Sequence, residues 1–524
     1  MKIQYVCHSC IYIDTGDAKI VTDPWFSGAA YHNQWNLFPK PVNANILSDV
    51  DHVIISHGHE DHLHSKSLKL LPKTAKVFYP YLWRKGVNKY LHGLGFKDVQ
   101  EAFSFKTYKL TQDTKVTYIA NNLDAIVIIE SKGKVLVNLN DALNSHHKNI
   151  IRLVVGQIKK RWPKIDYLFC GLGGAGYFPN TVHYEGKKDR EIGKLREQFL
   201  AHNFCKLIKL LQPDIVLPFT PGFALLAPGQ QWINEIKFPR ELLDKYYRDN
   251  FDADSKIWFV NMYPGDELEE NVFNKCSPYH SKLKNNSLSH LIPTEYAEEI
   301  KEAKKKKWAD EESARRVMEN LKKYIPKAAK LLNRETLNDV RFAVCLTDVM
   351  KDKYFNIEFK NNHLVIFRSK ELLDNRRLMI KTRTDIMDYS YSGPWGGDVL
   401  FIGYACDIDV FDESALEENL DIICLRLLTR YPTALGNLRR NPLRGLRYIA
   451  SNPKISALAL KHKILSRGKA NKLPFNERSH WLNKSACEIC GICDFPLMDQ
   501  SFGDSLRETE AVEEVPFAKT KLVY

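Results

Sequence analysis

The 524-residue sequence has no uninterrupted apolar run long enough to cross a membrane, and its N-terminus lacks the long uncharged core of a secretion signal. Cysteine is also sparse, with 11 residues, and three of them lie close together near the C-terminus. So few cysteines in so long a chain argue against a disulfide framework and favour a reducing compartment. We therefore expect a cytoplasmic protein without a transmembrane segment.

Acidic residues are missing from residues 425–476, although the whole chain carries 63 Asp and Glu beside 76 Lys and Arg. Clustered positive charge raises the local concentration of anions, so this stretch favours an anionic partner such as a small-molecule substrate. The basic stretch would also suit an anionic lipid or an acidic protein as a partner. Alternatively, it is a solvated basic surface with no partner. A nucleic-acid partner is not expected.

Length and residue patterning divide the chain into four parts. A chain of this length, with 44% apolar and 27% charged residues, is typical of a globular protein with more than one core. Short strand patterns alternate with helical ones in residues 1–285, which predicts sheets covered by helices. We expect a second α+β unit in residues 286–420, with a solvated pair of charged helices at 294–332. A basic helical segment at 421–476 and a Cys-rich tail at 477–524 complete the chain.

A cluster of potential metal ligands follows the strand pattern at residues 53–56. Its sequence is Ser56-His57-Gly58-His59-Glu60-Asp61-His62, which has the spacing His-x-His-x-Asp-His. Imidazole nitrogens and a carboxylate oxygen suit Zn, Fe or Mn, and a loop at the end of a strand can hold them around an open coordination position. A single His more often has a packing role, but four ligand-type residues within six positions predict a centre for one or two Fe or Zn ions.

With this motif the sequence resembles the metallo-β-lactamase superfamily, and the resemblance implies an α/β fold with an αββα sandwich. It also implies that His57 and His59 bind one metal ion, and that Asp61 and His62 bind a second. Asp141, which follows another strand pattern, matches the carboxylate that bridges the two ions in that superfamily. Asp61 or Asp141 would then be the catalytic carboxylate that orients the reactant.

Two further residues near the N-terminus, His8 and Asp23, resemble residues that lie beneath the metals in this superfamily, where they orient the ligands. Two other family ligands are missing. Hydrolases carry a third His after the strand that corresponds to residues 116–119, and a final His after the strand that corresponds to residues 215–218. The sequence has neither, unless a loop residue substitutes; the loop residues considered are His146, His147 and His183.

The same departures fit a narrower resemblance, to the metallo-β-lactamase-like part of the CMP-N-acetylneuraminate hydroxylases. It rests on several segments that occur in the same order. They are Leu123-Asp124-Ala125, Gly173-Gly174-Ala175-Gly176-Tyr177-Phe178-Pro179, Leu217-Pro218-Phe219 and Asp398-Val399-Leu400-Phe401-Ile402-Gly403-Tyr404. The resemblance implies an oxygenase that hydroxylates a nucleotide sugar or amino sugar. It places Asp124, Gly174, Tyr177 and His183 around the metals or at the substrate.

Those hydroxylases also carry an N-terminal Rieske domain, and this sequence begins directly with the metal-binding unit. If electrons are needed, an electron-donor protein or the Cys-rich tail has to supply them. The tail offers three thiolates and one imidazole as potential ligands, from Cys487, Cys490, Cys493 and His480. Their spacing fits either a structural zinc ion or a [4Fe-4S] cluster.

Two reactions therefore remain open for the same loop. An iron-dependent oxygenase fits the missing His ligands, whereas a hydrolase that uses a metal-bound water to attack an ester, lactone or phosphodiester fits the missing Rieske domain. A purely structural metal in a binding scaffold is a third reading. We favour the oxygenase, because the loss of two hydrolytic ligands is the more specific observation.

Overall fold

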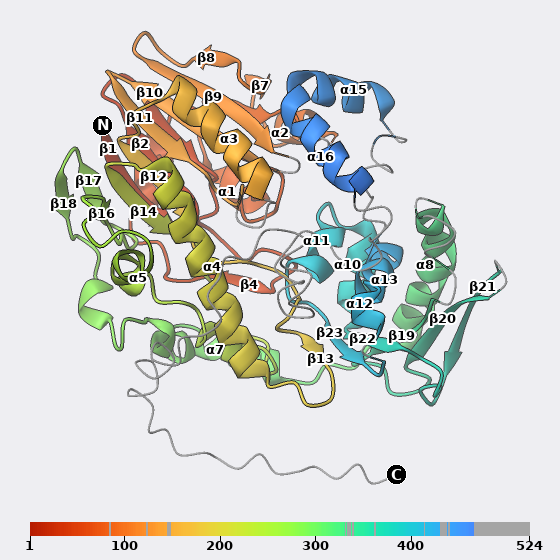
Figure 1. Cartoon of the computed structure of the whole chain (residues 1–524). Coiled ribbons are helices and arrows are strands. Elements are labelled where there is room, and N and C mark those ends of the chain that lie inside the picture. Colours follow the sequence, from red (N-terminus) through yellow and green to blue (C-terminus); the bar gives the residue numbers. More distant parts are fainter. Residues whose placement is uncertain are drawn as a thin grey trace.

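The computed structural model of the chain (Figure 1) describes residues 1–465, with short gaps. The gaps are residues 83–84, 122–123, 144–147, 331, 333–336, 338–339, 361–362, 413, 430–437 and 439–440. The proposed Cys-rich tail, with its four potential ligands, lies outside the described residues. Among the helices of the described part, each is too short or too polar to span a lipid bilayer.

Two large sheets form the N-terminal unit. The first has the order β18-β17-β1-β2-β3-β5-β6-β7, and the second has the order β16-β14-β12-β11-β10-β9-β8. The strands of the first sheet are β1 (Lys2–Cys7), β2 (Cys10–Asp14), β3 (Lys19–Thr22), β5 (His52–Ile54), β6 (Lys76–Pro80), β7 (Val99–Ala102), β17 (Glu267–Glu269) and β18 (Val272–Asn274). Those of the second are β8 (Thr107–Lys109), β9 (Thr114–Asn121), β10 (Asp124–Ser131), β11 (Lys134–Asn138), β12 (Tyr167–Gly171), β14 (Ile215–Phe219) and β16 (Trp258–Phe259). A separate pair joins β4 (Trp35–Leu37) to β15 (Phe223–Leu225).

Alternating apolar side chains let the second sheet bury both of its faces. On β10, Val127 and Ile129 join the core between the two sheets, whereas Ile126 and Ile128 join the core beneath the helices. Helices α3 (Lys148–Arg161), α4 (Asp189–Leu211) and α5 (Leu243–Asn250) contribute to that second core, and Figure 1 shows α3 and α4 lying across the sheet. Helices α1 (Ser65–Leu70) and α2 (Val87–Gly93) bury apolar residues in the core that contains the other face of the first sheet. This confirms the predicted αββα sandwich.

A third sheet builds the second, α+β unit, in the order β13-β23-β22-β19-β20-β21. Its strands are β13 (Val182–His183), β19 (Arg341–Leu346), β20 (Tyr354–Lys360), β21 (His363–Ser369), β22 (Leu378–Thr382) and β23 (Asp407–Val410). The short β13 comes from the N-terminal unit and pairs Val182 with Ile408 in parallel. The two units therefore share a sheet as well as a continuous apolar core.

The remaining helices follow in chain order. They are α6 (Ile292–Glu295), α7 (Ala297–Lys304), α8 (Glu311–Ala329), α10 (Thr384–Ser392), α11 (Gly396–Phe401), α12 (Ser414–Glu417), α13 (Leu420–Thr429), α15 (Pro442–Ser451) and α16 (Pro453–Leu465). Short 3-10 helices are η1 (Ala44–Asp49), η2 (Gln231–Asn234), η3 (Arg240–Leu242), η4 (His280–Lys282) and η5 (Ser289–Leu291).

The charged helices at 294–332 are not a solvated pair throughout. Helix α7 has no buried residue, as expected, but α8 buries one complete face in the core. The buried residues are Ala314, Val317, Leu321, Ile325 and Ala328. Their spacing of three and four residues is that of an amphipathic helix packed on a core, and the many Lys, Arg and Glu residues around them obscure this signal.

We expect Leu321→Ala to lower the free energy of unfolding by about 2–5 kcal/mol, because it leaves a cavity at a fully buried position. Lys322→Ala, on the exposed face of the same helix, is the matched control and is expected to change stability by less than about 0.5 kcal/mol. Chemical denaturation followed by circular dichroism measures both. Equal stabilities of the two variants would restore the solvated-helix interpretation.

Candidate metal centre

The residues of the predicted metal loop lie where several strands end at one edge of the sandwich. Strands β3 and β5 are parallel neighbours, so Asp23, just after β3, lies beside the loop that follows β5. The Asp23 backbone N–H donates to Ile54 O at 2.9 Å, and its Oδ1 accepts from the Ser56 N–H at 2.7 Å. The fully buried Asp23 carboxylate thus fixes the start of the ligand loop.

Asp23 also sets the orientation of two imidazoles. The Ser56 hydroxyl lies 2.7 Å from Asp23 Oδ2 and 2.9 Å from His57 Nδ1, so it can donate to the carboxylate and accept from the ring. His62 Nδ1 lies 3.0 Å from the same Asp23 Oδ2. With each Nδ1 carrying the proton, Nε2 of His57 and of His62 presents a lone pair to the site. This is the arrangement that a metal-binding imidazole needs.

One group of potential ligand atoms comprises His57, His59 and Asp141, whose ligand atoms lie within 4.8 Å of one another. His57 Nε2 is 2.8 Å from His59 Nδ1 and 3.7 Å from Asp141 Oδ2. Asp141 follows β11, and the same Oδ2 is 3.5 Å from His62 Nε2. Asp141 therefore lies between the two imidazoles that the superfamily resemblance assigned to different metals, as a bridging carboxylate would.

A second group comprises His8, Asp61 and His62, all of which are buried. His62 Nε2 is 3.3 Å from Asp61 Oδ2 and makes no hydrogen bond within the described part of the chain. Burial opposes a charge on His62, but the carboxylates of Asp61, Asp23 and Asp141 outweigh it and raise the pKa of His62 well above its usual value. The proton on His62 neutralises excess negative charge. A divalent cation would do the same, so this donor set fits a metal ion.

Asp61 is held from two sides. The Tyr31 hydroxyl donates to Asp61 Oδ1 at 2.5 Å, and His8 Nε2 lies 3.0 Å from Asp61 Oδ2. Burial would raise the pKa of Asp61, yet the neighbouring imidazoles of His62 and His8 keep it well below its usual value. Asp61 is thus a carboxylate in a fixed orientation.

His8 is oriented differently from the two imidazoles that Asp23 anchors. The Gly222 backbone N–H donates to His8 Nδ1 at 3.0 Å, so the proton of a neutral His8 ring is on Nε2 and points to Asp61. In this orientation His8 is a hydrogen-bond donor to Asp61 and has no lone pair for a metal. A side chain at position 222 would place its Cβ 2.6 Å from His8 Cα, so the close approach of the chain to His8 requires glycine there.

Asp124, at the start of β10, lies where the other missing His would be expected. Its Oδ1 is 3.8 Å from His57 Nε2 and makes no hydrogen bond to any described residue. Burial without such a partner raises the pKa of Asp124 to about 6, although His59 opposes the shift. A buried carboxylate oxygen without a partner is costly unless a cation is bound nearby. Asp124 therefore fits a metal ligand better than the supporting position that the sequence indicated.

The other predicted site residues have partners elsewhere. Arg196 donates to the carbonyl oxygens of Gly174 and Ala175, each at 3.2 Å, and so holds the glycine-rich loop against α4. The Tyr177 hydroxyl donates to Asp421 at 2.7 Å. None of these residues belongs to the ligand groups found among the described residues.

His183 does not join the ligand groups of the described residues either, so the structure does not bring it in as a substitute ligand. It lies between Asp189 at 3.3 Å and Asp407 at 3.2 Å, and hydrogen bonds to these carboxylates raise its pKa to about 9. These contacts join β13 to the second unit. The other two potential substitutes, His146 and His147, lie outside the described residues.

Sequence reasoning missed three residues that support the site. Ser56 links Asp23 to His57 by hydrogen bonds, and the Tyr31 hydroxyl donates to Asp61. Trp395, from the second unit, donates its indole N–H to Gly58 O at 2.8 Å and so contacts the ligand loop directly. Only Ser56 had a local signal, since it precedes the first His of the motif; the other two are distant in sequence.

Comparison with known proteins agrees with this fold. The model of a family described as beta-lactamase superfamily domain matches residues 2–146. The cytidine monophosphate-N-acetylneuraminic acid hydroxylase of Danio rerio is 27% identical over 254 residues, which cover 45% of this chain and 40% of that protein. The chain thus spans less than half the length of this relative. Together with the αββα sandwich, these matches confirm the metallo-β-lactamase fold and the resemblance to the hydroxylases.

Two solved structures overlap with part of the chain. CmlA, a diiron β-hydroxylase from Streptomyces venezuelae, is 16% identical, with a TM-score of 0.34, over 51% of this chain and 53% of CmlA. An isothiocyanate hydrolase from Delia radicum gut bacteria is 12% identical, with a TM-score of 0.36, over 51% of this chain and 99% of the hydrolase.

Proposed function

We propose that this chain, whose N-terminal unit has the metallo-β-lactamase fold, is an iron-dependent oxygenase that hydroxylates an anionic metabolite. The observation that carries this proposal is the Asp124 carboxylate beside His57, whose Oδ1 is buried and makes no hydrogen bond to any described residue. Two imidazoles with a carboxylate form the donor set of non-haem iron oxygenases, whereas three imidazoles are typical of hydrolytic zinc. The hydroxylase relative supports the same reaction class.

The two ligand groups suggest which residues would hold each metal ion. His57, His59 and Asp124 would hold one ion, Asp61 and His62 the other, and Asp141 would bridge them. When bound, iron would supply the oxygen activation, and hydroxylation of a C–H bond with O2 takes two electrons and two protons and releases one water. Asp23 would keep the imidazole protons on Nδ1, through Ser56 for His57 and directly for His62, and His8 and Tyr31 would keep Asp61 charged and oriented.

The substrate and the electron source are the finer parts of the proposal. The Danio rerio relative is a hydroxylase named for cytidine monophosphate-N-acetylneuraminic acid, so a nucleotide sugar or amino sugar is the first substrate class to test. The net charge of +13 supports an anionic substrate. A separate electron-donor protein is proposed as the partner, with a cluster at the Cys-rich tail as a further possible relay.

A metal-dependent hydrolase is the alternative, and one observation favours it. Asp141 is 37% exposed, although it lies within 3.7 Å of both His57 and His62. A carboxylate that reaches both the ligands and the solvent could orient a metal-bound water for attack on an ester, lactone or phosphodiester.

Metal analysis of anaerobically purified protein, together with visible absorption spectroscopy, separates the two reactions. The oxygenase is expected to contain iron, to show a charge-transfer band in the blue, and to consume O2 when CMP-N-acetylneuraminate and a reductant are added, with one oxygen atom gained by the product. Stoichiometric zinc without iron, and hydrolysis without O2 consumption, would refute the oxygenase and establish the alternative.

A further inference from the structure

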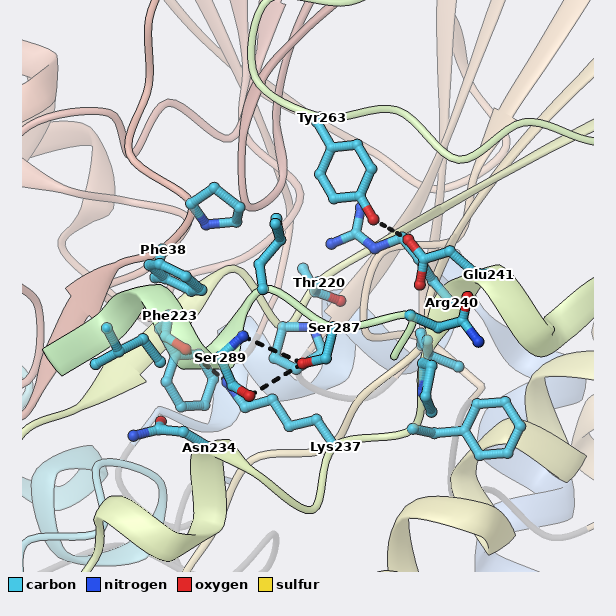
Figure 2. Close-up of a pocket in the computed structure, with 18 residues that line it drawn as sticks. Phe38, Thr220, Phe223, Asn234, Lys237, Arg240, Glu241, Tyr263, Ser287 and Ser289 are labelled. Atoms are coloured by element: carbon cyan, nitrogen blue, oxygen red, sulfur yellow. Dashed lines mark hydrogen bonds between the residues drawn. The ribbon is translucent and has the colours of Figure 1, made fainter. Parts of the chain in front are cut away.

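A second concave site lies next to the metal centre and is not used by the proposed reaction. It is an open pocket with an empty volume of about 610 Å³, which includes space open to solvent. Its wall includes Thr220 and Pro221, just after β14, and the next residue, Gly222, contacts His8. Figure 2 shows the lining, with Thr220 near the middle of the view and the labelled residues of several segments around it.

The pocket contains two basic side chains that make no ion pair with the part of the chain that the structure describes. Neither Lys237 nor Arg240 has a carboxylate oxygen within 4.0 Å among the described residues, and both instead donate to backbone carbonyls. Lys237 Nζ donates to Phe223 O at 2.5 Å and lies 4.1 Å from the centre of the Phe223 ring. Burial lowers the pKa of Lys237 to about 7, although Glu197 opposes the shift. An anion bound in the pocket would stabilise the charged form of Lys237 and so raise its pKa again.

The Glu241 carboxylate also lines the pocket and contributes to the net charge of the lining. Glu241 accepts a hydrogen bond from the Tyr263 hydroxyl, and burial raises its pKa, against the attraction of Arg240. With Lys237 and Arg240 charged and Glu241 ionised, the lining has an excess of one positive charge. If Glu241 is protonated, the excess is two.

Hydroxyl groups supply further donors. Thr220 is only 5% exposed, and its Oγ1 makes no hydrogen bond to any described residue. Ser287 and Ser289 also line the pocket, with their hydroxyls 3.0 Å apart. A buried hydroxyl without a partner costs free energy unless a ligand or water satisfies it, so Thr220 points to a polar occupant.

We propose that this pocket binds the phosphate or carboxylate group of a small molecule, through the Lys237 and Arg240 side chains and the Thr220 hydroxyl. Several donors of this kind match an oxyanion with several acceptor oxygens, and charge-assisted hydrogen bonds are the strong ones. The site is distinct from the metal ligands. It does not depend on which reaction the metal centre performs.

Inorganic phosphate, titrated calorimetrically into the full-length protein, is the test ligand, and acetate is compared with it to distinguish the two anion classes. We expect one phosphate per chain with a Kd below about 1 mM. Lys237→Met, which keeps the length and apolar stem of the side chain, is expected to weaken binding by more than about tenfold. Lys245→Gln, an exposed lysine on α5 outside the pocket lining, is the matched control and is expected to bind as the wild type does.

Thr220→Val separates a binding role from a structural one. Valine has the same shape but no hydroxyl, so it is expected to leave the melting temperature unchanged or higher while it weakens phosphate binding by about threefold to tenfold. His57→Ala excludes phosphate bound to a metal ion and is expected to retain the wild-type affinity. The proposal is overturned if phosphate does not bind the wild type, if binding survives Lys237→Met and Thr220→Val unchanged, or if it is lost in His57→Ala. Stronger binding of acetate than of phosphate would assign the pocket to a carboxylate.

Discussion

His57→Ala is expected to empty the first metal position and to abolish turnover while the chain stays folded. The His57 ring lies in the ligand group with His59 and Asp141, and its Nδ1 is held by Ser56. Loss of a group that only orients a ligand costs roughly 10–100-fold in metal affinity, so loss of the ligand itself is expected to cost more than about 100-fold. Inductively coupled plasma mass spectrometry of purified protein measures the metal, and circular dichroism measures the fold.

His59→Ala is expected to give the same result, because His59 Nδ1 is the nearest partner of His57 Nε2 in the site. His290→Ala is the matched control, since that imidazole is exposed and belongs to neither ligand group of the described residues. It should keep wild-type metal content and activity. Full metal content in both loop variants would show that the ligand assignment is wrong.

Asp124→His is expected to convert the proposed iron site toward a zinc site. The substitution replaces a carboxylate whose Oδ1 lies 3.8 Å from His57 Nε2 with an imidazole. Two imidazoles and a carboxylate suit iron, and three imidazoles suit zinc. We therefore expect the iron content to fall by at least about tenfold, O2-dependent turnover to fall by at least about 100-fold, and zinc binding to persist.

Asp124→Glu retains the carboxylate and serves as the control for side-chain size, so it should keep iron better than Asp124→His. Asp124→Asn has the shape of the native residue without its charge, and it tests the same role if the larger His does not fit the buried position. The variants are compared by iron and zinc content and by O2 consumption with CMP-N-acetylneuraminate. Wild-type iron content and turnover in both Asp124→His and Asp124→Asn would exclude Asp124 as a ligand.

Much of the fold follows from local patterns in the sequence. The strand patterns at residues 116–119 and 215–218 lie within β9 and β14. These elements are predictable because their apolar residues repeat with the period of a strand or a helix. Helix α8 was misread because its charged residues outnumber the apolar ones that face the core.

The ligand loop was also visible in the sequence, because its four ligand-type residues lie within six positions. What supports that loop was not. Tyr31 and Trp395 reach Asp61 and Gly58 from segments distant in sequence, and no periodicity connects them. The proposed role of Asp124 depends on the burial of its Oδ1 and on the lack of a hydrogen-bond partner for that atom among the described residues, which only three-dimensional contacts reveal.

Asp23, the carboxylate beneath the ligand loop, would couple the two proposed metal positions. Asp23 Oδ2 accepts from the Ser56 hydroxyl, which supports His57, and also lies 3.0 Å from Nδ1 of His62. The two positions therefore depend on the same carboxylate, although their ligands differ. Loss of the Asp23 carboxylate would then weaken both proposed ions together, so loading of the proposed centre would be coupled through the protein as well as through Asp141.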